Sequence, residues 1–426
     1  MIDGFAARRG KVAEPNLEHE LLMPRTAEAL DVRPSAASAA GANIGHIEIH
    51  AGYAPVLNDW ADLEDIAPIS IYQTRRWLIP WLETIGRAAK VEPAFVLVRG
   101  VDGRPAALLP FGLRRYPIGR LASFLGGKDA NFNLGLFRPG LRWTRADVTS
   151  LFLRTAADRS ARIDAFALFN QPYRWQGFDN PLAQFAHQPS PSFGSVGDLC
   201  PSADDLLSRR FSKDTLKTLR KKARRLETRF GALRHVTARD ARSAHAILEA
   251  FHAQKSARMR EQGLHDTFGE PAARTFLERA ATEHLASGRL GIELHALIAG
   301  ERIVATFGGA EHGGRFSGMF NSFDGDAEIA RSSPGELLFM KVVGAKCAEG
   351  LAAFDLGIGE AAYKTAYCDR IEALFDAFVP VSAAGHVLSR TVALQRRLKR
   401  TIKRSPWLWS AVGTFRILRA GRSDER

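Results

Sequence analysis

Apolar residues along the chain form short runs bounded by turn residues and longer stretches with helical spacing. Residues 94–99 and 106–113 are two apolar runs separated by the turn 100–105, which predicts a β-hairpin. Residues 291–298 and 303–308 repeat this pattern in the second half of the chain. The recurrence is weak, but it agrees with a tandem duplication of one α/β module.

Further elements are expected on both sides of each hairpin. In the first half, we expect an opening strand and turn at 47–57, a helix at 71–86, and strands at 121–125 and 165–170. In the second half, we expect strands at 315–323, 353–356 and 373–380, and helices at 335–349 and 360–367. Trp77 and Trp81 are four residues apart and share one face of the first helix.

The segment 213–230 carries the clearest helical pattern in the sequence. Its apolar residues recur at intervals of three and four, namely Leu216, Leu219, Ala223, Leu226 and Phe230. Ser212 is placed to cap the start of the helix, and Gly231 is placed to end it. Eight lysines and arginines against two acids give this segment a charge of +6.

The positive charge of the chain is concentrated in two places. The formal net charge is +13, and the tail 386–426 adds eleven cations against two acids to the helical segment, so the rest is near neutral. This distribution argues against a general nucleic-acid-coating surface and for two local anionic contacts. The helix 213–230 is either a solvated face or a site for nucleotide phosphates or tRNA. The tail suits either an anionic membrane surface or docking on its own domain.

Length and composition indicate a globular protein with two domains and tails. The chain has 426 residues, 46% apolar and 25% charged. Residues 1–44 are expected to be disordered and lack the apolar core of a signal peptide. No run of about 18 apolar residues predicts a membrane span. Three cysteines (Cys200, Cys347 and Cys368) lack metal-ligand or redox spacing. We therefore expect reduced thiols, no metal, and a cytoplasmic protein that is peripheral to the membrane if its tail binds one.

Residues 333–364 carry the most informative pattern. Ser333-Pro-Gly-Glu-Leu-Leu338 opens a helix, Phe354-Asp-Leu-Gly-Ile-Gly359 is a short buried strand ending in glycines, and Tyr363-Lys364 follows. A helix N-terminus carries roughly half a positive charge and presents backbone N–H groups, here those of Gly335, Glu336 and Leu337, so it suits a pyrophosphate. The residues expected to bind such a ligand are Arg331, Ser333, Gly335 and Leu337.

This order of motifs resembles the acetyltransferase domain of the cellulose-associated CelD/BcsL family, which is similar to the Fem-type peptidyltransferases with two GNAT-like modules. The resemblance covers roughly residues 45–385. It implies an α/β fold of two tandem GNAT-like modules with mixed, mainly antiparallel sheets, at 45–195 and 196–385, the second being catalytic. It also implies acetyl-CoA or another acyl-CoA as co-substrate. GNAT proteins often carry R-x-x-G-x-G/A before this helix, whereas here the glycine is shifted and Glu336 replaces the final small residue.

Five residues are candidates for the chemistry. Asp355 lies within a buried apolar strand, so it is either a structural ion-pair partner of Lys364 or Arg370, or an orienting acid or general base. Glu336 is either a second candidate base or a charge at a helix terminus. The resemblance implies that a tyrosine protonates the leaving thiolate, and it favours Tyr363 together with Lys364. Tyr367 shares a face with Tyr363, and packing is the alternative role for each tyrosine.

The leading hypothesis is an acyl-CoA-dependent N- or O-acyltransferase. The resemblance implies a sugar or polysaccharide-precursor acceptor, linked to cellulose or exopolysaccharide production. We expect no DNA partner. One alternative is a Fem-like aminoacyl-tRNA-dependent peptidyltransferase, although residues 213–290 leave room for only a modest helical segment where the Fem enzymes carry an arm. The other alternative is a non-catalytic scaffold of a membrane polysaccharide synthase.

Overall fold

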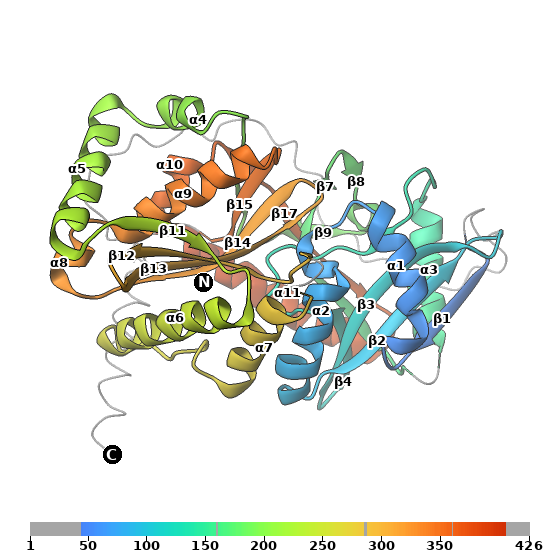
Figure 1. Ribbon diagram of the computed structural model, residues 1–426. Coiled ribbons are helices and arrows are strands. Elements are labelled where there is room, and N and C mark those ends of the chain that lie inside the picture. Colours follow the sequence, from blue (N-terminus) through green and yellow to red (C-terminus); the bar gives the residue numbers. More distant parts are fainter. Residues whose placement is uncertain (1–43, 159–160, 285–287, 360, 406–426) are drawn as a thin grey trace, which may run out of the picture.

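Two β-sheets lie side by side, each covered by helices on its faces (Figure 1). The computed structural model describes residues 44–158, 161–284, 288–359 and 361–405, without the side chains of residues 362, 363 and 404. The segment predicted to be disordered lies outside the described residues up to Asn43. The mixed α/β fold with largely antiparallel sheets is confirmed.

The first sheet contains most of the strands before residue 190. Its order is β1 (His46–His50), β2 (Glu92–Arg99), β3 (Pro105–Tyr116), β4 (Gly119–Phe124), β6 (Ala165–Pro172), β17 (Leu374–Pro380) and β9 (His187–Pro189), with β5 (Leu136–Phe137) beside β3. A small β7–β8 hairpin (Arg174–Trp175, Phe178–Asp179) follows β6. Helix α3 (Arg145–Ala157) packs on one face through Phe152, and α1 (Leu57–Ile66) and α2 (Arg75–Trp81) pack on the other face. The predicted hairpin is therefore β2–β3.

The second sheet is organised in the same way. Its order is β11 (Leu233–Thr237), β12 (Glu293–Ala299), β13 (Arg302–His312), β14 (Arg315–Phe323), β15 (Ala353–Ile358), β10 (Gly194–Asp198) and β16 (Arg370–Glu372). Helices α5 (Lys213–Phe230) and α9 (Pro334–Ala348), with α4 (Ala203–Arg210), cover one face. Helices α6 (Ala241–Glu261) and α7 (Pro271–Thr282) cover the other face. Two short helices, α8 (Ala327–Ala330) and α10 (Ala362–Tyr367), follow β14 and β15.

The two sheets exchange strands. β10, which leaves the first half of the chain, pairs antiparallel with β15 of the second sheet. β17, which follows the second sheet in sequence, pairs antiparallel with β6 of the first sheet. The chain therefore crosses between the sheets twice, and the predicted division at residue 196 falls inside β10. Each sheet needs a strand from the other half of the chain to cover what would otherwise be an open edge.

One hydrophobic core runs through the contact between the modules. Trp77 stacks on Trp81 with ring centroids 6.5 Å apart and meets Phe276 of α7 edge-on at 5.4 Å. Gly357, at a positive φ of 66°, lies against Asn131, so a side chain there would collide with the first module. Because the shared core includes helices of both modules, they form one packed body.

Helix α5 confirms the sequence prediction in full. It spans Lys213–Phe230, the Ser212 hydroxyl accepts a hydrogen bond from the Thr215 amide at 3.1 Å, and Gly231 ends it at φ 101°. Leu219 and Leu226 are buried against the second sheet. The lysines and arginines of the helix are largely exposed. The local signals of spacing and capping were sufficient here because the helix needs only one apolar stripe to dock.

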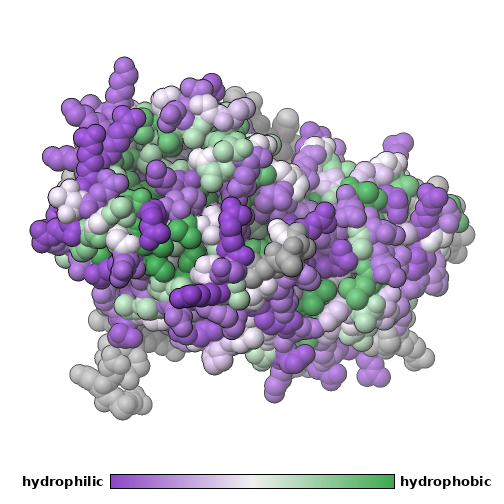
Figure 2. All heavy atoms as spheres, viewed as in Figure 1, coloured by the Kyte–Doolittle hydropathy of each residue, from purple (hydrophilic) through white to green (hydrophobic). Residues whose placement is uncertain are grey.

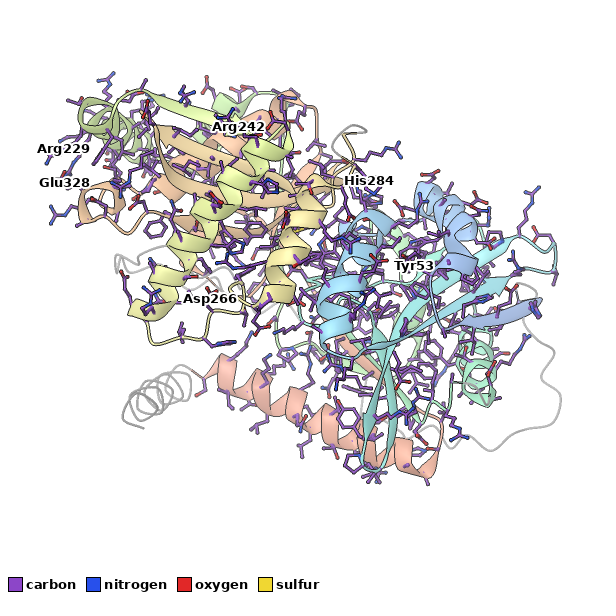
Figure 3. The ribbon with its side chains drawn as sticks, turned by 60° about the horizontal axis from the view of Figure 1, so that its bottom comes forward. Tyr53, Arg229, Arg242, Asp266, His284 and Glu328 are labelled. Carbon is purple, nitrogen blue, oxygen red and sulfur yellow. The ribbon has the colours of Figure 1, made fainter. Side chains whose placement is uncertain are left out.

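The described part of the basic tail is a helix docked on the first module. Helix α11 (Ala383–Arg404) lies along the first sheet, where it contacts β17, β6 and β4 (Figure 3). Arg396 makes a bidentate ion pair with the fully buried Asp376 of β17, with N···O distances of 2.6 and 2.9 Å. The side of the tail that carries Arg396 therefore binds protein, while Trp407 and Trp409 lie outside the described residues.

Candidate functional site

Each sheet contains a pair of parallel strands that part after a short stretch of pairing. In the second sheet, β14 and β15 pair from Arg315–Ala353 to Ser317–Asp355, although both strands continue beyond these residues. In the first sheet, β4 and β6 pair only at Leu121–Ala165 and Ala122–Phe166. We call these diverging strand pairs the second and the first wedge. Beyond the paired residues of each wedge, backbone N–H and C=O groups make no hydrogen bonds to the other strand of the pair.

The first wedge is filled by the chain itself. After β4 ends, residues 133–137 cross the open side of the wedge, since Asn133 bonds to β6 and Leu136 pairs with Leu108 of β3. The Asn133 amide donates to the Asn170 carbonyl at 3.2 Å, and the Asn133 side chain donates to the Phe169 carbonyl at 3.0 Å. These contacts occupy the edge of β6 that the wedge would otherwise leave to a ligand.

The second wedge holds a β-bulge on β14. Gly308 pairs with Phe320, but the next residue, Gly309, pairs with Gly318, so Met319 has no partner on β13. A bulge leaves backbone groups of the extra residue unpaired, and bulges recur next to active sites. The bulge could not be predicted from the sequence, since one extra residue inside an apolar strand does not alter its pattern of residue types.

Asp355 closes the narrow end of the second wedge. Its side chain is fully buried and accepts hydrogen bonds from Arg315 Nε at 2.8 Å, Ser317 Oγ at 2.6 Å and the Gly357 amide at 2.9 Å. The partner of Asp355 is thus Arg315, in place of the predicted Lys364 or Arg370. Paired and fully hydrogen-bonded, this carboxylate has the features of a structural group.

Lys364 and Arg370 are engaged elsewhere. The Lys364 ammonium donates to the carbonyls of Ile358 and Gly359, both at 3.1 Å, and so holds the end of β15. Arg370 forms an ion pair with Asp198 of β10. Tyr363 lies within α10, and its side chain is outside the described residues.

The N-terminus of α9 follows the second wedge and differs from the expected anion site. Ser333 occupies its N-cap position in a left-handed conformation (φ 51°, ψ 54°). The amides of Glu336 and Leu337, expected to be free, both donate to the Ser333 carbonyl at 3.0 and 3.1 Å. Of the three amides predicted to face a pyrophosphate, only that of Gly335 is outside this turn. Arg331, just before it, is exposed, and Leu337 is buried in the core.

Glu336, in this turn, and Tyr367, at the end of α10, both have raised pKa values. Burial raises the pKa of Glu336, and the positive charge of Lys222 on α5 opposes that rise. Burial, followed by the charge of Glu336, raises the pKa of Tyr367 well above its usual range. The Tyr367 hydroxyl is buried and has no hydrogen-bond partner among the described residues. A neutral tyrosine hydroxyl and a carboxyl group with a raised pKa are groups that can exchange protons with a substrate.

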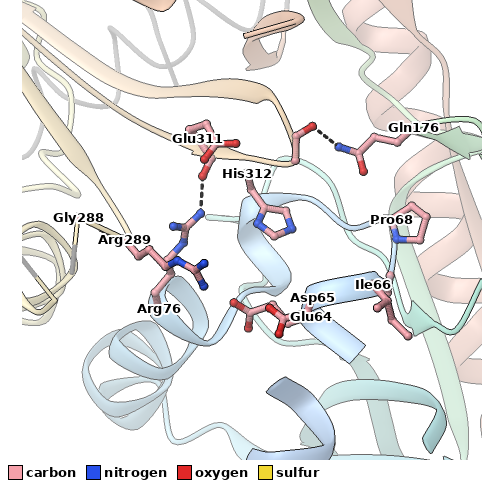
Figure 4. A pocket seen from close by; sticks show the side chains of 12 residues that line it. Glu64, Asp65, Ile66, Pro68, Arg76, Gln176, Gly288, Arg289, Glu311 and His312 are labelled. Atoms are coloured by element: carbon pink, nitrogen blue, oxygen red, sulfur yellow. Dashed lines mark hydrogen bonds between the residues drawn. The ribbon is translucent and has the colours of Figure 1, made fainter. Parts of the chain in front are cut away.

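A polar cavity lies between the modules, at the β13–β14 turn (Figure 4). Its volume is about 450 Å³, and it is lined by both modules: Glu64, Asp65, Ile66, Ala67, Pro68, Arg76, Gln176, Gly288, Arg289, Glu311, His312 and Gly313. Arg76 donates to the Glu311 carbonyl, and Gln176 donates to the Gly313 carbonyl at 2.7 Å. Burial, together with the charge of Arg76, lowers the pKa of His312, so its imidazole is neutral near pH 7.

No group of three or more His, Cys, Asp or Glu side chains in the described part of the chain is arranged to hold a metal ion. No helix there combines the length and apolar character needed to cross a membrane.

Comparison with known proteins places an acyltransferase domain in the second module. Residues 213–365 match the model of the acetyltransferase (GNAT) domain family. This stretch contains both strands of the second wedge and α9, and the protein is an acyltransferase on this evidence. No curated protein matches the chain in sequence.

The fold is similar to that of FemX. The crystal structure of FemX is 10% identical and matches 81% of this chain and 99% of its own, with a TM-score of 0.55. L-PGS from Bacillus licheniformis is 12% identical over 82% of this chain and 98% of its own, at a TM-score of 0.46. A tandem GNAT protein of the clavulanic acid pathway is 12% identical over 79% of this chain and 99% of its own, at a TM-score of 0.42. The last two are too distant to support an argument, and the first shows a shared fold.

Two buried tyrosines provide a matched test of the unpaired hydroxyl. Tyr367→Phe removes a hydroxyl that has no described partner, so the free energy of unfolding should stay the same or rise by up to about 1 kcal/mol. Tyr72→Phe should lower it by about 1–3 kcal/mol, because the Tyr72 hydroxyl accepts a 2.6 Å hydrogen bond from Asn131. Urea unfolding of both variants measures the difference. A loss of more than 1 kcal/mol in Tyr367→Phe would mean that this hydroxyl is bonded.

Proposed function

We propose that this protein transfers an acyl group, acetyl first among the candidates, from acyl-CoA to a hydroxyl or amine of a saccharide acceptor. The observation that carries the proposal is the difference between the two wedges. The first is filled by residues 133–137, whereas the second holds the Met319 bulge and leads to the N-terminus of α9. The donor then lies along β14 in the second wedge, within the matched GNAT domain.

The proposed chemistry is a direct transfer with two proton movements. The acceptor oxygen or nitrogen attacks the thioester carbon while Glu336 takes the acceptor proton, directly or through water. Backbone N–H groups at the bulge stabilise the charge that forms on the carbonyl oxygen. The carbon–sulfur bond then breaks, and Tyr367 gives its proton to the departing thiolate. Glu336 afterwards loses its proton to solvent, and Tyr367 regains one.

The acceptor is proposed to bind in the cavity between the modules. Guanidinium, imidazole, carboxylate and amide groups line it, and such groups suit a ligand rich in hydroxyls. Arg315, which follows the glycine turn at the cavity, and Met319 of the bulge are four residues apart on the extended strand β14, roughly 13 Å. An acceptor that reaches both places is therefore extended, as an oligosaccharide or a lipid-linked saccharide is. The link to cellulose or exopolysaccharide production rests on the family resemblance alone.

A second candidate is transfer from aminoacyl-tRNA, as the Fem resemblance implies. The exposed cationic side of α5 favours it, since Figure 2 shows hydrophilic side chains gathered over that helix. Against it, α6 and α7 both pack on the body of the molecule instead of forming an arm. Salt-sensitive binding of charged tRNA, without binding of acyl-CoA, would favour this candidate. Binding of acyl-CoA without turnover would favour the scaffold role.

Calorimetric titration with acetyl-CoA tests the donor. We expect micromolar binding by the wild type and loss of binding in Gly335→Glu, because a carboxylate in the first turn of α9 repels the pyrophosphate. Thermal unfolding of both proteins should show that the variant is folded. If a folded wild type does not bind acetyl-CoA, acyl-CoA is not the donor and the tRNA candidate moves ahead.

We also propose that the outer side of α11 contacts an anionic membrane. Val387, Leu394 and Leu398 are 55%, 66% and 58% exposed, although they are aliphatic. Their spacing places them on one stripe of the helix, and exposed cations such as Arg390 and Lys399 flank it. An apolar stripe bordered by cations is typical of helices that lie on lipid headgroups.

Vesicle flotation tests the membrane contact. The wild type should bind vesicles containing phosphatidylglycerol, and the double variant Leu394→Gln/Leu398→Gln should bind several-fold less, because two aliphatic side chains no longer enter the lipid. Leu264→Gln removes an exposed leucine of the other module and serves as the control. Equal binding by the double variant, or no binding by the wild type, would exclude this contact.

A further inference from the structure

We propose that Lys222 of α5 binds a phosphate of the donor, so that the basic helix forms one side of the donor site. This inference rests on the acyl-CoA donor proposed above and adds a residue outside the loop that the motif identified. Lys222 is half-buried, unlike most cations of α5, and its ammonium donates a 2.8 Å hydrogen bond to the Ser333 hydroxyl. The cation is thereby held at the N-terminus of α9.

Ser333 does not use its hydroxyl as the N-cap residues of five other helices use their side chains. At the starts of α3, α4, α5, α6 and α11, a Thr, Ser or Asp side chain accepts a hydrogen bond from a backbone amide of the first turn. Ser333 makes no such bond. Its left-handed backbone is costly for a residue with a side chain, and it directs the hydroxyl to Lys222 instead. The start of α9 thus combines an uncapped helix end with a fixed cation.

Two buried hydroxyls, one next to this turn and one on a side chain packed against α9, have no hydrogen-bond partner in the described part of the chain. Ser332, next to Ser333, is fully buried, and its Oγ is unsatisfied. Tyr367, whose ring meets Phe339 of α9 edge-on with centroids 4.6 Å apart, is 3% exposed, and its hydroxyl is also unsatisfied. Unpaired buried hydroxyls are rare because each forfeits its hydration. A ligand with several acceptor oxygens would supply the missing partners.

Charge and geometry both leave Lys222 able to contact a ligand. An ammonium carries three N–H donors, and the Ser333 hydroxyl accepts from one of them. Arg229, two turns further along α5, forms an ion pair with Glu328 of α8 and ties the two helices together (Figure 3). Lys222 also counters the negative charge of Glu336, which would otherwise repel a phosphate. The positive charge of Lys222 therefore reduces the repulsion between Glu336 and a phosphate bound at this turn.

Acetyl-CoA titration of Lys222 variants tests the inference. Lys222→Gln should weaken the affinity for acetyl-CoA by about tenfold or more, the usual effect of losing a hydrogen bond between charged groups. Lys222→Arg should recover most of the affinity because it retains the charge. Lys217→Gln removes the same charge from an exposed position of the same helix and should change the affinity less than about twofold. Circular dichroism and thermal unfolding confirm that each variant is folded.

The outcomes separate this inference from the donor proposal. If the wild type binds acetyl-CoA and Lys222→Gln binds within twofold of it, Lys222 does not contact the donor, while the donor proposal stands. If Lys217→Gln weakens binding as much as Lys222→Gln, the effect is general electrostatics and the specific contact is wrong. If the folded wild type binds no acetyl-CoA, both proposals fail.

Discussion

The ion pair between Arg315 and Asp355 holds the centre of the molecule together. Asp355 ends the pairing of β14 with β15, so the point at which the second wedge opens is fixed by this pair. Arg315 also lies over the Trp175 ring at 4.1 Å and over the Phe132 ring at 5.0 Å, both from the first module. Removing the arginine from such a buried ion pair lowers the free energy of unfolding by about 3–5 kcal/mol. The wedge and the contact between modules therefore depend on the same two side chains.

The two modules share one strand topology but differ in whether the chain itself crosses the wedge. Both contain a parallel strand pair that parts, and both receive a strand from the other half of the chain. In the first module, residues 133–137 enter the wedge, and neighbouring Phe132 packs under Arg315. The filling of the first wedge and the support of the second are thus made by one segment.

Local features were predictable from the sequence, and long-range ones were not. Helix α5 and the β2–β3 and β12–β13 hairpins followed from spacing, caps and turn residues, which act within a few residues. The strand exchange, the Arg315 partner of Asp355 and the Lys222 contact join residues 40 to more than 100 positions apart. No periodic pattern encodes such pairs. The sequence did identify Asp355 as a buried charge in need of a partner. It named Glu336 and Tyr367 only separately, as a candidate base and as the alternative to Tyr363 for the acid.

Hydrogen exchange with and without acetyl-CoA is the most direct test that the second wedge is the donor site and the first is closed. We expect slower exchange in peptides covering 318–323 and 332–338, because bound donor would protect the amides of the bulge and of the first turn of α9. Peptides covering 121–137 should exchange equally in both states. Protection of 121–137, or no change across 318–338 while the ligand is bound, would show that the donor does not bind in the second wedge alone.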